Sequence, residues 1–307
     1  MNFALLFEQL LNGLQFGVML FLMAAGLTLV FGIMNFINLA HGSLYMVGAY
    51  LALAAAKWTG SYLLGVALGL AGTLVVGMLV EIIALRTLYD RDHLDQVLAT
   101  FGLILFFNEL IAILWGRAAL FASAPSWLSG HIDLFTGSRY PAYRAAIIGI
   151  GLVTALILWY VVTRTRLGML IRAGATNRTM VAALGVNIRL LYTVVFGFGA
   201  ALAGLAGLLS GPIYNVQPGM GEQILIQVFV VIVIGGIGSI RGALVGAIIV
   251  GIVDTLGRAF LKPVLGTLIS PPAAESAGPA LASMLIYLLM AVVLAFRPQG
   301  LFPARGG

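Results

Sequence analysis

Two short segments concentrate polar and glycine residues in an otherwise apolar chain, and both could line a path for a polar solute. The first segment, residues 32–45, contains Asn35, Asn38, His41 and Ser43. The first three are spaced i, i+3 and i+6, so a helix would place them roughly on one face. Buried polar side chains cost free energy in hydrocarbon unless they are hydrogen-bonded or face a cavity. Two interpretations are therefore open: hydrogen bonds between helices that fix packing, or a broken helix, including Gly42, that lines a polar path.

Metal or haem ligation at this segment is disfavoured. The other two histidines fall in predicted loops, and no further ligand cluster accompanies His41. The sequence therefore predicts no metal site and no cofactor in this chain.

The second segment, residues 235–242, holds four glycines among eight residues, which a regular helix does not easily accommodate. Gly236 and Gly238 begin a dinucleotide-binding pattern, but Arg241 occupies the third glycine position and no soluble strand precedes the segment. That motif is rejected. Broken helices are typical of transporters, and the free N–H groups of a helix N-terminus suit a carboxylate. The residues that we assign to this part of the path are Gly235, Gly236, Gly238 and Ser239.

The segment 164–189 contains five arginines and no acidic residue. Within it, Thr176 is the expected N-cap of a short helix, and Gly185 is expected to follow its C-cap. Met180, Val181 and Leu184 are expected to form one apolar face. This amphipathic helix either rests on the lipid interface or docks into a groove on a cytoplasmic partner.

The chain lacks the residues of an ATPase site. Only two lysines are present, Lys57 and Lys262, and neither follows a glycine, whereas a Walker A loop needs Gly-Lys-Ser/Thr. If transport is driven by ATP, the ATPase is another chain. An intramembrane enzyme is disfavoured because no nucleophile–base pair or ligand set stands out.

An ion-coupled secondary carrier is a further alternative. Such carriers usually hold carboxylates deep in the bilayer. The acidic residues that we consider are expected near the ends of predicted spans, which weakens this alternative without excluding it. They are Glu8, Glu109, Glu222 and Asp254.

These segments must be positioned by membrane-spanning helices. Of the 307 residues, 62% are hydrophobic and only 8% are charged, whereas a typical globular protein carries about 25% charged residues. The uncharged intervals are long enough for helices of about 20 residues and lack the alternation of barrel strands. The chain has no cysteine, so disulfides and thiolate metal sites are excluded. The net charge of +6 comes mostly from loops and does not indicate a nucleic-acid partner.

We predict a single all-α transmembrane domain over residues 1–307, with eight to ten helices. Residues 1–10 form either a surface helix or an extension of the first span, which is expected to remain in the protein. Small residues four apart, such as Gly13 and Gly17, predict close helix packing. The expected spans lie near 11–33, 41–56, 62–85, 95–115, 145–163, 190–211, 222–237, 242–258 and 280–296.

Basic residues in the loops predict the orientation. The arginine-rich segment 164–189, the turn 86–95 and the C-terminus are expected in the cytoplasm. The loops 116–144, 212–221 and 259–279 are expected on the outer side, and the side of the N-terminus is left open. The first of these loops and its borders carry aromatic residues that suit an interfacial belt, namely Trp115, Trp127, Tyr140 and Tyr143.

Taken together, several motifs resemble the permease subunits of branched-chain amino acid ABC importers, and the resemblance covers nearly the whole chain. The motifs are residues 26–32 with Asn35, 38–42 and 48–50; Arg172, Ala173, Asn177, Ala182, Ala183 and Gly185; 235–239 with 241–243, 246 and 247; and 297–302.

The resemblance implies a type II-like importer fold and a bacterial inner-membrane location. A sister permease, two cytoplasmic ATPases that bind ATP and Mg, and a periplasmic binding protein would complete the transporter. The family's coupling segment maps onto Arg172, Ala173, Asn177, Ala182, Ala183 and Gly185, beside Met180 and Leu184 of the predicted helix. Urea and short-chain amide importers share this pattern, so the substrate stays open between them and branched-chain amino acids.

Overall fold

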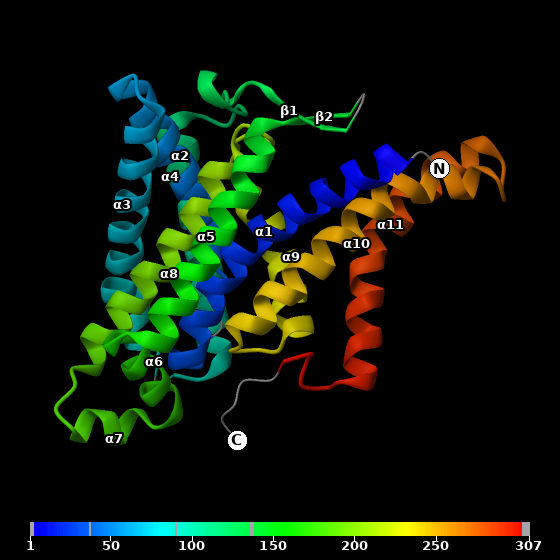
Figure 1. The fold of residues 1–307 in the computed structure, drawn as a ribbon. Coiled ribbons are helices and arrows are strands. Elements are labelled where there is room, and N and C mark those ends of the chain that lie inside the picture. Colours follow the sequence, from blue (N-terminus) through cyan, green and yellow to red (C-terminus); the bar gives the residue numbers. More distant parts are fainter. Residues whose placement is uncertain (1–2, 37, 90, 136–137, 303–307) are drawn as a thin grey trace. The chain divides into compact units, whose positions relative to one another are not determined.

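The computed structural model describes residues 3–36, 38–89, 91–135 and 138–302, and it confirms an all-α architecture (Figure 1). All nine predicted spans coincide with helices in these ranges, and α1 extends from Phe3, so residues 3–10 lengthen the first span. The long helices are α1 (Phe3–Met34), α2 (His41–Thr59), α3 (Tyr62–Val80), α4 (His93–Trp115), α5 (Ala142–Arg164), α8 (Ile188–Ser210), α9 (Met220–Gly235), α10 (Ile240–Gly266) and α11 (Pro271–Phe296).

Seven of these helices, α1, α3, α4, α5, α8, α10 and α11, are long and apolar enough to cross a membrane. The short elements complete the described chain. They are the π-helical turn η1 (Glu81–Leu85), the 3-10 turns η2 (Arg86–Leu88) and η3 (Ser126–Leu128), the helices α6 (Arg166–Thr176) and α7 (Arg178–Ala183), and the strands β1 (His131–Phe135) and β2 (Ser138–Pro141).

The contacts of the chain group into two units, and the predicted single domain stays a prediction. Unit 1 comprises Met1–Phe21, Ala124–Leu152 and Val228–Ala304, and unit 2 comprises Leu22–Ser123, Val153–Gln227 and Arg305–Gly307.

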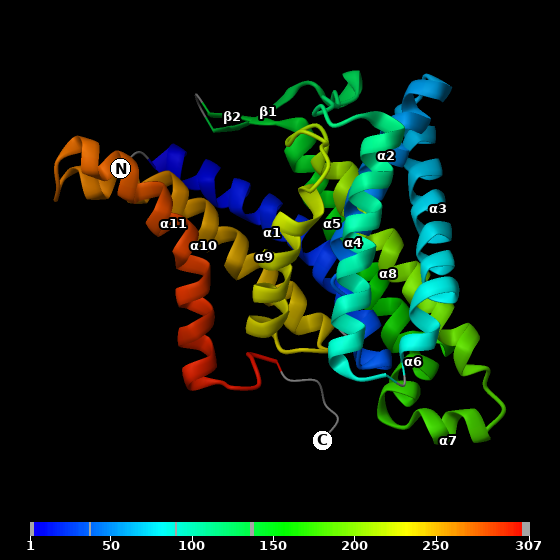
Figure 2. The same ribbon diagram turned by 180° about the vertical axis from the view of Figure 1, so that it is seen from behind.

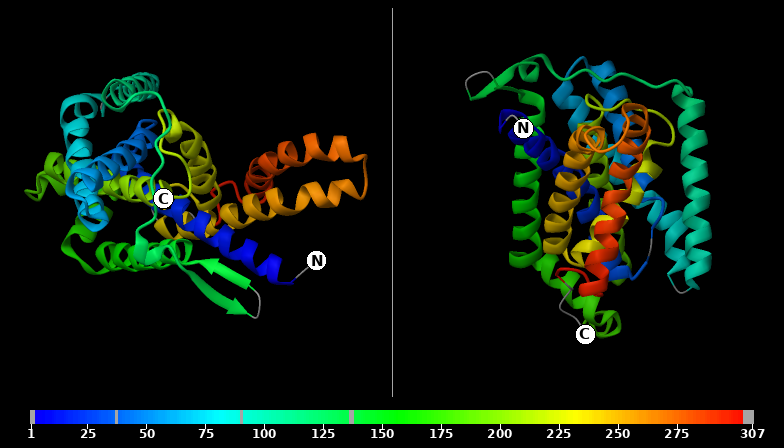
Figure 3. Two further views of the ribbon diagram at one scale, coloured as in Figure 1. Left: turned by 90° about the horizontal axis from the view of Figure 1, so that it is seen from above. Right: turned by 90° about the vertical axis from the view of Figure 1, so that its right-hand side faces the viewer.

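Within unit 1, α10 and α11 run side by side (Figure 3). The first half of α1 packs against α10 through its glycines, because a Cβ at Gly13 would lie 2.8 Å from the Cα of Ile252. The antiparallel hairpin β1–β2, which the sequence analysis did not predict, pairs Ile132 with Tyr140 and leads into α5. Tyr140 and Tyr143 are buried, so their assignment to an exposed aromatic belt is wrong.

Within unit 2, α2, α3 and α8 pack against one another (Figure 2). Gly48 packs directly on Gly204 of α8, where a Cβ would collide with backbone atoms, so small residues permit close approach of these two helices. At one end of the unit, Leu120 and Val216 form a β-bridge. At the other end, Arg86 contacts Thr193. The β-bridge places loop 116–144 beside loop 212–221, as expected; the sides of the membrane stay a prediction.

Candidate functional site

The first predicted break folds back into unit 2. Helix α1 ends at Met34, and Asn35 adopts a left-handed backbone with φ 50°. His41 Nε2 then lies 3.2 Å from the carbonyl oxygen of Met23. Met23 is three turns of α1 before Met34, about 16 Å along the helix axis. The break therefore runs back along α1, and α2 begins inside the unit.

Several buried polar groups at the start of α2 lack protein partners. Asn38 and His41 are 0% exposed and Ser43 is 3% exposed. Within the described chain, both amide atoms of Asn38, Nδ1 of His41 and Oγ of Ser43 have no hydrogen-bond partner. Leaving such a group unpaired costs about 1–3 kcal/mol, so a purely structural joint would be expected to pair more of them.

The break differs in one respect from its predicted geometry. Residues 35, 36 and 38 are not helical, and the side chain of Asn35 is exposed while that of Asn38 is buried. The expected common helical face of Asn35, Asn38 and His41 is therefore wrong, because the chain leaves the helix at Met34. Asn38, His41, Gly42 and Ser43 nevertheless lie within one turn of the start of α2.

The start of α9 packs against the start of α2 within unit 2. Gly42 and Gly221 are in backbone contact, and a Cβ on either would collide with the other. In the first turn of α9, Glu222 accepts a hydrogen bond of 2.6 Å from Asn108 Nδ2. Asn108 Oδ1 in turn accepts one of 3.3 Å from the N–H of Gly219. Two helix N-termini, which favour negative charge, thus meet beside one carboxylate.

The second predicted break has a different chemistry. Ser239 caps α10 by accepting a hydrogen bond of 3.1 Å from the N–H of Gly242. Gly236 and Gly238 have φ values of 105° and 82°, which glycine tolerates without strain. The backbone N–H groups of residues 301 and 302 donate to the carbonyls of Ile234 and Gly235, each at 2.9 Å.

Unlike the start of α2, this joint is closed by protein partners. Close backbone contacts explain why glycines are needed at this joint, and no bound solute is required to explain them. The assignment of Gly235, Gly236, Gly238 and Ser239 to the path stays a prediction.

The predicted coupling segment forms two helices, α6 and α7, and not one. Its N-cap is Asn177, which accepts a hydrogen bond of 2.9 Å from the N–H of Met180. The predicted cap at Thr176 is wrong, because that hydroxyl donates to the carbonyl of Arg172. Gly185 follows the C-cap as expected, with φ 85°.

The apolar side chains of α7 divide between two faces. Val181 is buried, whereas Met180 is 62% exposed and Leu184 is 78% exposed. The predicted single face of all three is therefore wrong, and only Met180 and Leu184 are free to contact a partner. The remaining predicted coupling residues lie on the same two helices and are mostly exposed: Arg172, Ala173, Ala182 and Ala183.

A buried ionic cluster lies beside the coupling segment and was not predicted from the sequence. Glu81 is 0% exposed and forms a salt bridge of 3.1 Å with Arg86. It also accepts hydrogen bonds of 2.6 Å from Thr193 and 2.9 Å from Tyr89. An acidic residue followed five positions later by arginine, inside an apolar stretch, was the available signal.

This cluster connects three parts of unit 2. Thr193 and Tyr192 lie in the first turns of α8, directly after the coupling segment, and the Tyr192 ring is 5.3 Å from that of Tyr89. Tyr89 also packs edge-on against Phe36 of the break, at 5.9 Å. Burial and the neighbouring Glu81 carboxylate raise the pKa of the Tyr89 hydroxyl, so it remains a donor at neutral pH.

One of the acidic residues lies deeper than predicted. Asp254 is in the middle of α10, because that helix continues to Gly266, and it is 4% exposed. Its charge is balanced by Arg258 one turn later, at 2.8 Å. Across the described ranges, no group of three or more acidic, histidine or cysteine side chains is arranged to hold a metal ion.

Comparison with known proteins identifies relatives over most of the chain. Residues 9–294 match the family model described as the permease component of branched-chain amino acid transport systems. The high-affinity branched-chain amino acid transport permease LivH of Escherichia coli K12 is 32% identical, with coverage of 85% of this chain and 89% of the relative. BraD of Pseudomonas aeruginosa PAO1 is 31% identical, with 96% and 94% coverage.

A more distant relative transports a sugar. The ribose import permease RbsC of Escherichia coli K12 is 26% identical, with coverage of 80% of this chain and 77% of that protein. No solved structure matches.

Proposed function

Because this chain belongs to the permease family of branched-chain amino acid transport systems, we propose that it forms the pore of an ATP-driven importer for leucine, isoleucine and valine. It is a multi-pass inner-membrane protein, and its described residues contain seven helices suited to span the bilayer. Its role is to provide the path, and the energy comes from other subunits.

The observation that supports a path for an amino acid is the cluster where α2 and α9 begin. An amino acid is a zwitterion, so it must find partners of both signs when it leaves water. The start of α2 offers donor groups with Asn38 and Ser43, and helix N-termini favour a carboxylate. Because His41 Nε2 donates to the carbonyl of Met23, the unpaired Nδ1 of the neutral ring is an acceptor. Glu222, at the start of α9, is suited to an ammonium group. Separation of the two helix starts, now closed at Gly42, would expose these groups to the solute.

The proposed transporter contains four kinds of subunit. A sister permease completes the pore, two cytoplasmic ATPases bind ATP and Mg, and a periplasmic binding protein delivers the substrate. Met180 of α7 and Leu184, which directly follows this helix, are the proposed contacts with an ATPase. Closure of the ATPase pair would move α7, and the Glu81 cluster would pass this movement to Phe36 in the break.

Reconstitution tests this proposal. The chain, its sister permease, the ATPases and the binding protein are placed in liposomes, and uptake of labelled leucine, isoleucine, valine, urea and ribose is compared. Uptake of the three amino acids that requires ATP and the binding protein is expected, and a nucleotide-binding-deficient ATPase serves as the control. Urea uptake without amino acid uptake would favour an amide importer, and uptake by this chain alone under an ion gradient would refute the proposal.

A further inference from the structure

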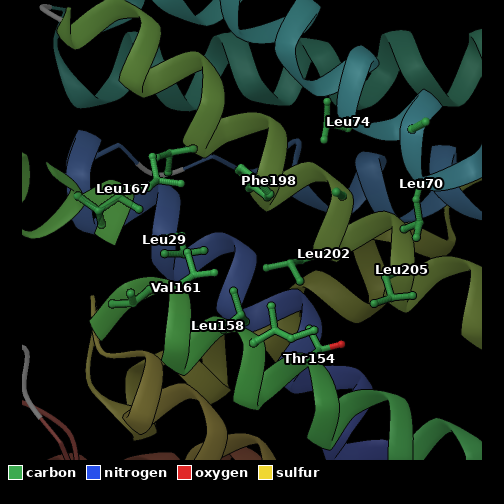
Figure 4. Close-up of a pocket in the computed structure, with 16 residues that line it drawn as sticks. Leu29, Leu70, Leu74, Thr154, Leu158, Val161, Leu167, Phe198, Leu202 and Leu205 are labelled. Atoms are coloured by element: carbon green, nitrogen blue, oxygen red, sulfur yellow. The ribbon is translucent and has the colours of Figure 1, made fainter. Parts of the chain in front are cut away.

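Unit 2 contains an apolar cavity of about 270 Å³ that the translocation path does not use. Its walls come from α1, α3, α5, α6 and α8, and Figure 4 shows the labelled side chains gathered around it. Thr154 is the single residue with a polar side chain among those that line it. A zwitterionic amino acid would lose its hydrogen bonds there without replacement, so the cavity suits a hydrocarbon.

The dimensions of the cavity match one leaflet of a bilayer. Along α8 it extends from Val195 to Leu205, a distance of about 15 Å at 1.5 Å per residue. The hydrocarbon core of a bilayer is about 30 Å thick. Because Val195 is near the start of α8, this end of the cavity adjoins the arginine-rich segment.

Two arginines without acidic partners flank that end. Val162 and Leu167 line the cavity, and the corner between them carries Arg164 and Arg166. Both arginines are exposed, and no salt bridge joins either of them to an acidic group in the described part of the chain.

The corner is held in place by Thr165. Its hydroxyl donates to the carbonyl of Val161 at 2.6 Å and accepts from the N–H of Gly168 at 3.2 Å. The position of the two arginines at the mouth of the cavity is therefore part of the fold of this corner.

We propose that this cavity binds an anionic phospholipid of the cytoplasmic leaflet. One acyl chain lies between α3, α5 and α8, and the headgroup phosphate lies between Arg164 and Arg166. Basic side chains at the cytoplasmic surface attract anionic headgroups. The neighbouring α5 is well placed for lipid contact, because only 17% of its apolar window is buried. Since α6 lies between this lipid and α7, the lipid stabilises the base of the coupling segment.

Photolabelling of the reconstituted complex tests the site without measuring transport. Vesicles of phosphatidylcholine receive a small amount of either phosphatidylglycerol or phosphatidylcholine, each carrying a diazirine on one acyl chain, and labelled peptides are mapped by mass spectrometry. Phosphatidylglycerol is expected to label α5 and α8 preferentially. The double substitution Arg164→Gln/Arg166→Gln is expected to lower this labelling, by about fivefold for each arginine.

Two further variants separate the headgroup from the chain. Ala201→Phe fills the cavity and is expected to reduce labelling while both arginines remain. Arg117→Gln/Arg139→Gln removes two charges elsewhere and is expected to leave labelling unchanged; thermal unfolding of each complex verifies that it is folded. Equal labelling by the two probes, unchanged labelling in Arg164→Gln/Arg166→Gln, or crosslinks from the cavity to the sister permease in place of lipid would overturn the proposal.

Discussion

Replacement of Arg86 by methionine tests whether burial gives the Glu81 cluster its strength. The substitution keeps an unbranched side chain but leaves the Glu81 carboxylate, which is 0% exposed, without its cation. Breaking a buried ion pair in this way costs about 3–5 kcal/mol. Because the Arg86 side chain is itself 32% exposed and Thr193 and Tyr89 still donate to Glu81, we expect the free energy of unfolding to fall by about 3 kcal/mol.

The chain offers a matched control for this substitution. Arg117 pairs with Glu109 at 2.8 Å, but the two side chains are 76% and 60% exposed. An exposed pair contributes about 0–1 kcal/mol, so Arg117→Met is expected to have little effect. Tyr89→Phe removes one hydrogen bond to a carboxylate and should cost about 1.5–3 kcal/mol.

Equilibrium unfolding of the purified protein in mixed micelles, followed by tryptophan fluorescence, measures these losses. The expected order of destabilisation is Arg86→Met, then Tyr89→Phe, then Arg117→Met. Equal losses for Arg86→Met and Arg117→Met would show that the cluster is not buried as described, and the reasoning from burial would fail. In the reconstituted transporter, Tyr89→Phe should also lower the number of substrate molecules transported per ATP, if the cluster transmits the movement of α7.

Four other predictions concern the path and the coupling segment. Met180→Asp combined with Leu184→Asp should abolish co-purification of the ATPase while the chain remains in the membrane; unchanged association would remove α7 from the interface. Asn177→Ala deletes the N-cap of α7 and should lower the stability of this helix by about 1 kcal/mol. We expect this loss to appear as a roughly fivefold weaker association with the ATPase. An unaltered affinity would argue against a preformed α7. His41→Ala should reduce amino acid uptake while the complex stays intact, and normal uptake would assign the break to helix packing. Gly42→Val should block uptake, because the larger side chain prevents the close contact with α9.

The sequence by itself determined the fold class and the positions of the helices. In a bilayer, an uncharged apolar interval of about 20 residues can pair its backbone N–H and C=O groups only by forming a helix. All nine predicted spans are helices in the structure. The special backbone at Gly185 was also predictable, because a glycine after a short helix commonly adopts positive φ. These features depend on local composition and on the solvent, and both can be read from the sequence.

Only the tertiary structure distinguished the two breaks. Both are rich in polar or glycine residues, yet the hydrogen bonds of residues 301 and 302 close the second, while Asn38 and Ser43 in the first remain unpaired. The burial of Glu81 depends on Thr193, which is 112 residues away in the chain. Whether a polar group is satisfied depends on partners that folding brings together from distant segments, and no local pattern specifies them.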